Sequence, residues 1–257
     1  IIVHPDVRKM LLTAKAYAEG GRALQIWCTL LLDKAHNHAD EKVRKDSDEL
    51  VALLTPIVKA FITDNGHIST NACMQVFGGH GFIKEWGMEQ FTRDNRINMI
   101  YEGTNTIQSL DLLGRKVLGN NGATLKKFGK LIGVLVAEEG VNEKMAEFIN
   151  PLAMLGEQMT KFTTELGFKG LQNPDEVGAA AVDYLRVAGH LVFGYLFARM
   201  AQVALREIAA GNADPFYVAK LQTARFYFAK LFPETVTLMR TARAGSKVLM
   251  DTDAALA

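Results

Sequence analysis

The residues best suited to chemistry lie within 75–118, where two glycine-rich breaks flank one short predicted helix. The second break carries Glu102, a single carboxylate that follows the apolar run Met99 to Tyr101 and precedes a glycine. A carboxylate held against apolar side chains takes up a proton more readily than a solvated one, which suits a general base working near neutral pH. The alternative is a solvated glutamate stabilised by the dipole at a helix N-terminus. The residues alone leave both interpretations open.

The first break reads Gly78-Gly79 and lies among the aromatic residues Phe77, Phe82 and Trp86. It is not the glycine-rich fingerprint of a dinucleotide-binding fold, because no strand is expected before it. Residues without side chains instead let another molecule approach the backbone closely. The break is therefore a candidate binding loop.

The second half of the chain offers few groups for catalysis. Its one histidine, His190, falls on an apolar helix, which favours a structural role over a ligand or a base. The run Arg225 to Phe228 holds three aromatics but no wider basic stripe, so core packing is favoured over stacking on nucleic acid. Cys28 and Cys73 lack metal-ligand spacing, so we expect reduced thiols and no metal site. The formal net charge of +1 provides no field that attracts nucleic acid.

Helices must position these groups, because strand patterns are nearly absent. A stripe at three- and four-residue steps predicts a long helix from near Pro5, with Gly20-Gly21 at a close helix–helix approach. Thr55-Pro56 predicts a further helix start, and the helix that follows should end at the Gly78-Gly79 break. Shorter helices are expected over 88–96 and 104–118, with a sharp turn over 98–103. The stripe consists of Met10, Ala14, Tyr17, Gly21, Leu24, Cys28 and Leu31.

Residues 119–122, Gly-Asn-Asn-Gly, form the clearest boundary in the chain. Beyond it, helix starts near 122, 151, 174 and 215 predict an up-down-up-down bundle, with stops at Gly167 and Gly211 and a break at Pro233. We therefore predict an all-α fold of two consecutive up-and-down helical bundles, with domains at 1–118 and 122–257. Each bundle is expected to bury its own core.

The chain has no signal-peptide pattern, and its most apolar run, 191–197, is shorter than the roughly 20 residues of a bilayer-spanning helix. A cytoplasmic protein without a membrane span is therefore expected. The chain begins Ile1-Ile2-Val3 without a methionine, which suggests a piece of a longer protein.

Three motifs resemble the acyl-CoA dehydrogenase family. They are YEGTNTIQ at 101–108, QVFGGHGF at 75–82 and HPDVRKMLL at 4–12. The resemblance covers about residues 1–118 and implies that family's C-terminal helical domain. The remainder resembles, in its helical pattern and its position in the chain, the extra helical domain of a subgroup that includes enzymes like 3-methylmercaptopropionyl-CoA dehydrogenase.

The resemblance implies roles for particular residues. Glu102 aligns with the base that takes the α-proton of an acyl-CoA thioester while the β-hydrogen leaves as hydride to FAD. The resemblance places two residues beside the thioester, Tyr101 and Gly103. It places five beside the flavin dinucleotide: Gln75, Gly78, Gly79, Thr104 and Thr106. Because Thr106 is short where the family often carries a longer polar residue, its contact is the weakest of these.

The resemblance also implies binding partners, and it implies that the chain alone is not active. A homo-oligomer, with a dimer preferred, and an electron-transfer flavoprotein as acceptor are expected. Two alternatives stay open: an acyl-CoA oxidase, and a helical assembly module without catalysis. Since the family's other domains supply most of the flavin site, the chain alone is expected to be inactive. It should also expose an apolar patch near Phe82, Trp86 and Tyr101.

Overall fold

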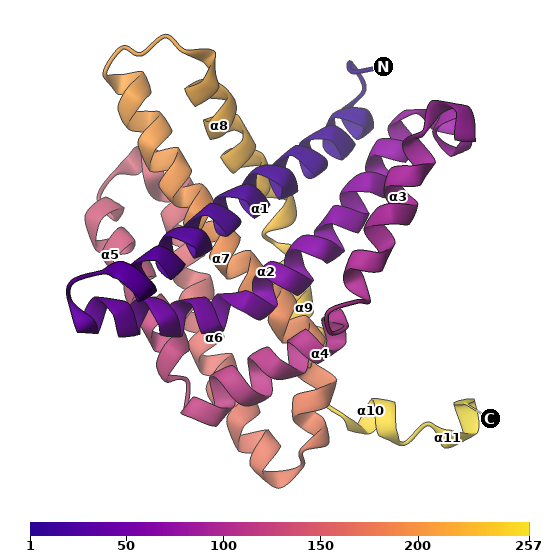
Figure 1. Cartoon of the computed structure of the whole chain (residues 1–257), viewed down its shortest axis with the longest axis vertical. Coiled ribbons are helices and arrows are strands. Elements are labelled where there is room, and N and C mark those ends of the chain that lie inside the picture. The colour runs from indigo at the N-terminus through magenta and orange to yellow at the C-terminus, as the bar shows by residue number, and fades with distance from the viewer. Residues whose placement is uncertain (257) are drawn as a thin grey trace.

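The computed structural model describes residues 1–256, and all of its regular elements within that range are helical. The predicted all-α class is therefore confirmed, and Figure 1 shows the arrangement. The α-helices are α1 (Pro5–Asn37), α2 (Glu41–Val76), α3 (Met88–Arg96), α4 (Asn105–Leu110), α5 (Ala123–Glu139), α6 (Ala146–Gln172), α7 (Asp175–Ala209), α8 (Pro215–Phe226), α9 (Glu234–Ala242), α10 (Lys247–Met250) and α11 (Asp253–Leu256). Short 3-10 turns are η1 (Gly78–Phe82), η2 (Lys84–Trp86), η3 (Ile97–Met99), η5 (Leu118–Asn120) and η6 (Glu143–Met145), and π-helical turns are η4 (Asp111–Val117) and η7 (Tyr227–Leu231).

The long helices α1 and α2 form an antiparallel hairpin that lies across α7 (Figure 1). As predicted, α1 begins at Pro5, and the predicted close approach at Gly20 is also present. A Cβ at Gly20 would lie 2.5 Å from the ring of Phe193 on α7, so only glycine fits there without movement of the ring. Asp40 caps the start of α2 by accepting a hydrogen bond from the Lys42 amide at 2.8 Å.

The predicted helix start at Thr55-Pro56 is wrong, because α2 runs through both residues without a break. Proline lacks the N–H that would normally bond to the carbonyl four residues earlier, here that of Ala52. The ammonium group of Lys116 donates a hydrogen bond to this Ala52 carbonyl and replaces the missing donor. A partner 64 residues away in sequence thus makes an interior proline tolerable, and no local pattern signals it.

Two further helix boundaries differ from the prediction. Helix α6 begins at Ala146 rather than near Pro151. The carbonyl that Pro151 leaves without a donor belongs to Glu147, a half-buried residue, so solvent can replace the missing donor. Gly167 does not end α6; its missing side chain instead leaves room for Leu118, which would lie 3.5 Å from a Cβ at that position. Gly211, with φ of +83°, does follow the end of α7 as predicted.

Helix α7 is the central element of the molecule, with nearly every residue from Tyr184 to Ala198 buried. By length and composition it is apolar enough to cross a membrane, which the sequence-based prediction from its apolar run missed. However, 72% of its most apolar window is buried inside the protein. Contacts with α1, α2, α4, α6, α8 and α9 account for this composition, as expected of a core helix.

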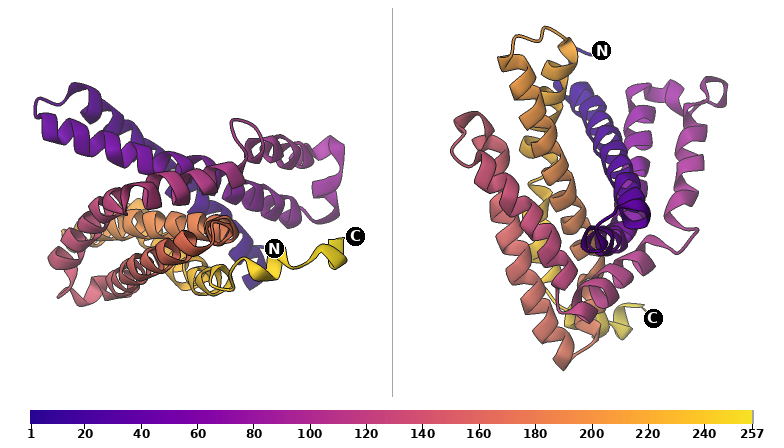
Figure 2. Two further views of the ribbon diagram at one scale, coloured as in Figure 1. Left: turned by 90° about the horizontal axis from the view of Figure 1, so that it is seen from below. Right: turned by 60° about the vertical axis from the view of Figure 1, so that its left-hand side comes forward.

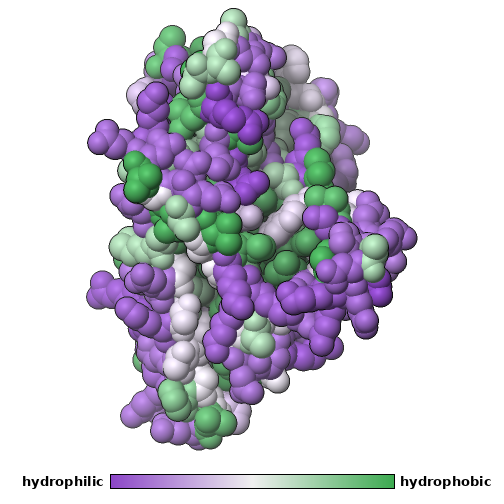
Figure 3. Space-filling model, turned by 90° about the vertical axis from the view of Figure 1, so that its left-hand side faces the viewer, coloured by the Kyte–Doolittle hydropathy of each residue, from purple (hydrophilic) through white to green (hydrophobic). Residues whose placement is uncertain are grey.

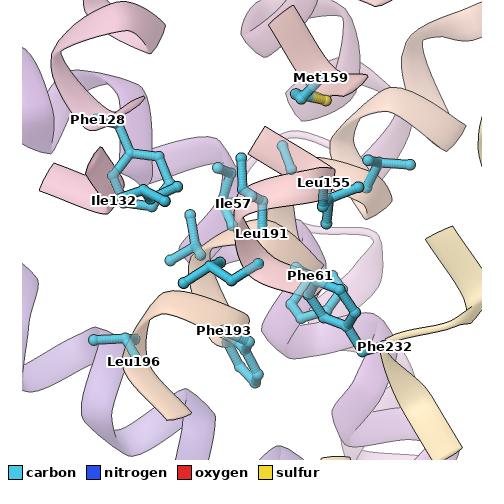
Figure 4. Close-up of a cluster of buried hydrophobic side chains, with 14 of the residues drawn as sticks. Ile57, Phe61, Phe128, Ile132, Leu155, Met159, Leu191, Phe193, Leu196 and Phe232 are labelled. Carbon is cyan, nitrogen blue, oxygen red and sulfur yellow. The ribbon is translucent and has the colours of Figure 1, made fainter. Parts of the chain in front are cut away.

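One hydrophobic core extends through both halves of the chain. Seen from below, in the left view of Figure 2, α2–α4 lie across a second layer of α5–α9, and α1 slopes from the first layer down to the second. Figure 4 shows side chains from both layers meeting, including Ile57 and Phe61 from α2, Phe128 from α5, Leu155 from α6 and Leu191 from α7. Buried side chains thus form one continuous cluster across the boundary between the two predicted bundles. The domain limits 1–118 and 122–257 remain a prediction about folding units.

Candidate functional site

The loop before α4 presents Glu102 in an unusual backbone conformation. Glu102 has φ of +57° and Gly103 has φ of +83°, so two successive residues are left-handed. This region is disfavoured for residues with a side chain, and such conformations concentrate at functional sites. The side-chain amide of Gln108 donates to the Glu102 carbonyl at 3.2 Å and closes the turn. The loop is thus held in a form that glycine would adopt more readily than glutamate.

The Glu102 side chain is exposed, so the apolar surroundings expected from Met99 to Tyr101 are not formed within this chain. Ile100 and Tyr101 are themselves 46% and 52% exposed. Glu102 therefore combines a left-handed backbone with a solvent-exposed side chain at the start of α4. Any apolar enclosure of this carboxylate has to come from another surface.

The beginning of α4 is fixed by two residues with different roles. Thr104 caps the helix, its hydroxyl accepting from the Ile107 amide at 3.4 Å. Asn105 reaches across to α2, where its amide nitrogen lies 2.6 Å from an Asp64 carboxylate oxygen. Sequence reasoning missed Asn105, because its partners lie more than 40 residues earlier and no local spacing connects them.

The Gly78-Gly79 loop lies at the other end of the α2–α3 hairpin. Gly78 is left-handed, with φ of +62°, and a Cβ on Gly78 or Gly79 would meet no atom within 4 Å. Gln75 is exposed one residue before the end of α2. From Asp64, beside the Glu102 loop, to Val76 the helix rises roughly 18 Å at 1.5 Å per residue.

The structure therefore brings some of the predicted residues together and separates others. Tyr101, Glu102, Gly103, Thr104 and Thr106 form one exposed group around the start of α4. The second group is at the far end of α2 and consists of Gln75, Gly78 and Gly79. A ligand held by both groups would have to be an elongated one.

Apolar side chains are exposed along the edge that joins these two groups. Phe82, Trp86 and Tyr101 are 79%, 59% and 52% exposed, in keeping with the apolar exposure expected near them. The rings of His80 and Trp86 pack edge to face, with their centroids 5.3 Å apart. Further exposed members on and around α3 are Phe77, Ile83, Phe91, Ile97, Ile100 and Ile107. Exposed apolar area of this kind is typical of surfaces that contact another molecule or domain.

A second set of polar groups lies inside the molecule and is structural. The Arg186 guanidinium pairs with the Glu234 carboxylate through two 2.8 Å hydrogen bonds and donates to Asn65 at 3.2 Å. His190 is fully buried, with one ring nitrogen 2.9 Å from Glu234 and the other 2.9 Å from the Tyr227 hydroxyl. The predictions of a structural His190 and of core packing at Tyr227 are confirmed, and the buried Asn65 also has hydrogen-bond partners.

This buried set makes the stability of the protein sensitive to acid. Partial burial raises the pKa of Glu234, but hydrogen bonds from His190 and Arg186 outweigh it and lower the pKa to about 2. Burial lowers the pKa of His190 below its ordinary value of 6.5, so the ring is neutral in the folded protein at neutral pH. Both groups release protons more readily in the folded state, so both stabilise it above their ordinary pKa values and lose that contribution as pH falls.

We expect Glu234→Gln to lower the free energy of unfolding by a constant amount above pH 4.5, the ordinary pKa of a glutamate. The difference from wild type should shrink as pH falls toward about 2, where Glu234 itself becomes protonated. Urea unfolding at a series of pH values measures it. The control is Glu157→Gln, an exposed glutamate on α6, which should show no such dependence. A Glu234→Gln penalty that stays unchanged down to pH 2 would contradict the assignment.

A groove with a volume of about 1000 Å³ lies between α5 and α6, away from all of the predicted site residues. Gly129, Gly133 and Gly156 line it, and a Cβ on any of them would meet no atom within 4 Å. Figure 3 shows the side of the molecule where α5 lies in Figure 1, with apolar and weakly polar residues exposed among hydrophilic ones. The groove holds no group suited to acid–base catalysis apart from Glu157 and two lysines.

Neither cysteine forms a disulfide in the described residues. Burial raises the pKa of the Cys28 thiol to about 11, which makes it a poor nucleophile. Residues 1–256 contain no group of three or more His, Cys, Asp or Glu side chains placed to hold a metal ion.

Comparison with known proteins gives two family matches. The family described as acyl-CoA dehydrogenase, C-terminal domain, matches residues 1–118. The family described as acetyl-CoA dehydrogenase C-terminal like matches residues 124–253. The matched segments contain the Glu102 loop and the α5–α9 layer, respectively.

Individual relatives agree with these matches. The chain is 38% identical to 3-methylmercaptopropionyl-CoA dehydrogenase of Ruegeria pomeroyi over 91% of this chain and 40% of that protein. Among solved structures, an acyl-CoA dehydrogenase from Bacillus anthracis complexed with FAD has a TM-score of 0.67 at 20% identity, covering 92% of this chain and 41% of that one. Caenorhabditis elegans ACDH-11 in complex with C11-CoA has a TM-score of 0.69 at 18% identity, covering 84% and 34%. The chain thus spans about two fifths of the length of the curated relatives it matches first.

Proposed function

The chain belongs to the acyl-CoA dehydrogenase family, and from that premise we propose that the whole protein dehydrogenates an acyl-CoA thioester between its α and β carbons. Glu102 is the proposed base. The observation that carries this proposal is the left-handed, exposed Glu102 at the start of α4, where a carboxylate is held off the core in a conformation that costs energy.

In the proposed reaction the Glu102 carboxylate accepts the α-proton of the thioester. The flavin, when bound, supplies the acceptor for the β-hydrogen, which leaves as hydride. Tyr101 and Gly103 flank the base in sequence, are exposed, and are proposed to border the thioester. Glu102 lacks apolar enclosure within this chain, so the exposed apolar edge near Tyr101 is proposed to close against another part of the protein and exclude water.

The residues proposed for FAD fit an extended ligand on two counts. Gly78 and Gly79 have free space where a side chain would stand, which allows a flat group to lie against the backbone. Thr104 and Thr106 are exposed at the beginning of α4, about 18 Å away along α2. Because the two groups are so far apart, we propose that they touch different parts of the cofactor, or cofactors of two subunits. In either arrangement they hold only its edges.

Partners and location belong to the same proposal. The substrate is an acyl-CoA, the electron acceptor an electron-transfer flavoprotein, and the assembly a homo-oligomer, with a dimer preferred. Cytoplasmic localisation is proposed as well. The acyl-CoA assignment is supported by the C11-CoA carried by the Caenorhabditis relative of the same fold.

The test is anaerobic mixing of the whole protein, with its flavin, and a series of acyl-CoA thioesters. Bleaching of the flavin absorbance by one or more thioesters is expected, and no bleaching by any of them would refute the proposal. Residues 1–257 alone are expected to neither retain FAD nor turn over, because weak partial contacts do not offset the cost of association. Stoichiometric flavin on this piece would contradict that expectation.

Two alternatives remain, and the same sample distinguishes them. An acyl-CoA oxidase would give the same bleaching but would be rapidly reoxidised by oxygen, whereas a dehydrogenase would require an electron-transfer flavoprotein or an artificial acceptor. An assembly module without catalysis would bind no acyl-CoA and show no bleaching. The presence of Glu102 in a strained loop favours a catalytic protein over the module.

A further inference from the structure

We propose that Asn105 is a positioning residue that fixes the Glu102 loop to α2 through hydrogen bonds with Asp64 and Lys59. The inference rests on the proposed function of Glu102 and extends it to residues of α2 that the sequence motifs do not mark. It concerns the rate of proton transfer rather than the binding of substrate or cofactor.

Both ends of the Asn105 side-chain amide are engaged. Its nitrogen donates to the Asp64 carboxylate at 2.6 Å and lies 3.3 Å from the Ala60 carbonyl, and its oxygen accepts from the Lys59 ammonium at 2.7 Å. The Thr63 hydroxyl lies 3.0 Å from the same nitrogen. One side chain therefore bonds to one face of α2 across a full helical turn.

The part of α2 that receives Asn105 is itself held firmly. Phe61 is fully buried, and the next residue after Asp64, Asn65, is buried between the Phe61 carbonyl and the Arg186 guanidinium of α7. Burial raises the pKa of Asp64 above its ordinary value of 3.8, although the Asn105 hydrogen bond and the charges of Arg186 and Lys59 act in the opposite direction. The anchor is thus a partly buried acceptor on a segment of α2 that is hydrogen-bonded to α7.

Only two residues, Gly103 and Thr104, separate this anchor from Glu102. Because Glu102 and Gly103 are left-handed, a small rotation at Asn105 would swing the carboxylate relative to α2. A base has to meet the proton it removes in a narrow geometry, and a displacement of about 1 Å can reduce a rate by ~10²-fold. Loss of the anchor should therefore lower kcat more than it changes KM.

A charge-swap pair tests the proposal in the whole protein. Asn105→Asp places a carboxylate against Asp64, and repulsion should release the loop. The double variant Asp64→Asn/Asn105→Asp restores a carboxamide–carboxylate hydrogen bond between the same positions and keeps an acceptor for Lys59. We expect kcat to fall by ~10²-fold in Asn105→Asp, with a much smaller change in KM at full flavin loading, and to recover in the double variant. Hydrogen exchange of amides 101–108 should rise and recover in parallel.

The matched control is Asn120→Asp, which makes the same change at a half-buried asparagine whose amide bonds to Thr124. It should leave kcat and exchange in 101–108 unaltered. Wild-type kcat and exchange in Asn105→Asp, or a double variant as impaired as the single one, would overturn the proposal. If Asn105→Asp fails to fold, the double variant alone decides. If the wild-type protein reduces no flavin with acyl-CoA, the proposed function fails, while the exchange data still report whether Asn105 anchors the loop.

Discussion

Replacing Glu102 by glutamine in the whole protein is expected to slow flavin reduction by acyl-CoA by at least ~10²- to 10⁴-fold, the contribution of a positioned general base. Glutamine has nearly the same shape and can occupy the same exposed, left-handed position, so the fold and the flavin content should be retained. Its amide cannot accept the α-proton, so only the chemical step is affected. Rapid mixing under anaerobic conditions measures the rate constant directly.

Two further variants make the Glu102 experiment specific. Glu102→Asp retains a carboxylate but withdraws it by one methylene, so an intermediate loss is expected if position matters as well as charge. Glu143→Gln, at an exposed glutamate in the connection between α5 and α6, is the matched control and should react at the wild-type rate. Bleaching of Glu102→Gln at a rate near that of wild type would remove Glu102 from the mechanism.

Local patterns in the sequence predicted several elements well. The expected helix over 88–96 matches α3, and Pro5 starts α1, because caps, prolines and glycines act through their immediate neighbours. The helix starts predicted at Thr55-Pro56 and Asn150-Pro151 are wrong because they depend on the surroundings of each proline in the folded protein. Each interior proline is tolerated through a contact or an exposure that local sequence does not encode, such as the Lys116 hydrogen bond to Ala52.

In the candidate site, too, the features set by neighbouring residues were predictable, whereas those set by residues far apart in sequence were not. The motif around Glu102 is contiguous in sequence and remains contiguous in space, so its residues stay together. The Asn105 anchor depends on Asp64 and Lys59 on another helix, and the exposure of Glu102 depends on how the Glu102 loop packs in the folded protein. Neither property follows from the spacing of residues along the chain.

The shared core leads to the largest expected effect on stability. Phe61 on α2 is fully buried, with its ring centroid 4.9 Å from that of Phe193 and 5.0 Å from that of His190, both on α7. A Cβ on Gly189 would lie 2.3 Å from the same ring, so α7 approaches α2 closely at this point. The side chain therefore connects the layer that carries the Glu102 loop to the layer of α5–α9.

Phe61→Ala is expected to lower the free energy of unfolding by ~3–5 kcal/mol, the usual cost of truncating a buried phenylalanine. Total stabilities are on the order of 5–15 kcal/mol, so this loss is a large fraction of the whole. Urea unfolding of residues 1–257 measures the loss, and hydrogen exchange shows where it falls. Because the two layers share one core, amides of α2 and α7 should lose protection together. The control Phe91→Ala removes a ring that is 64% exposed and should change stability by less than about 0.5 kcal/mol. If Phe61→Ala accelerates exchange in α2 while α7 keeps its full protection, the two layers unfold independently, and the division near residue 120 marks two folding units after all.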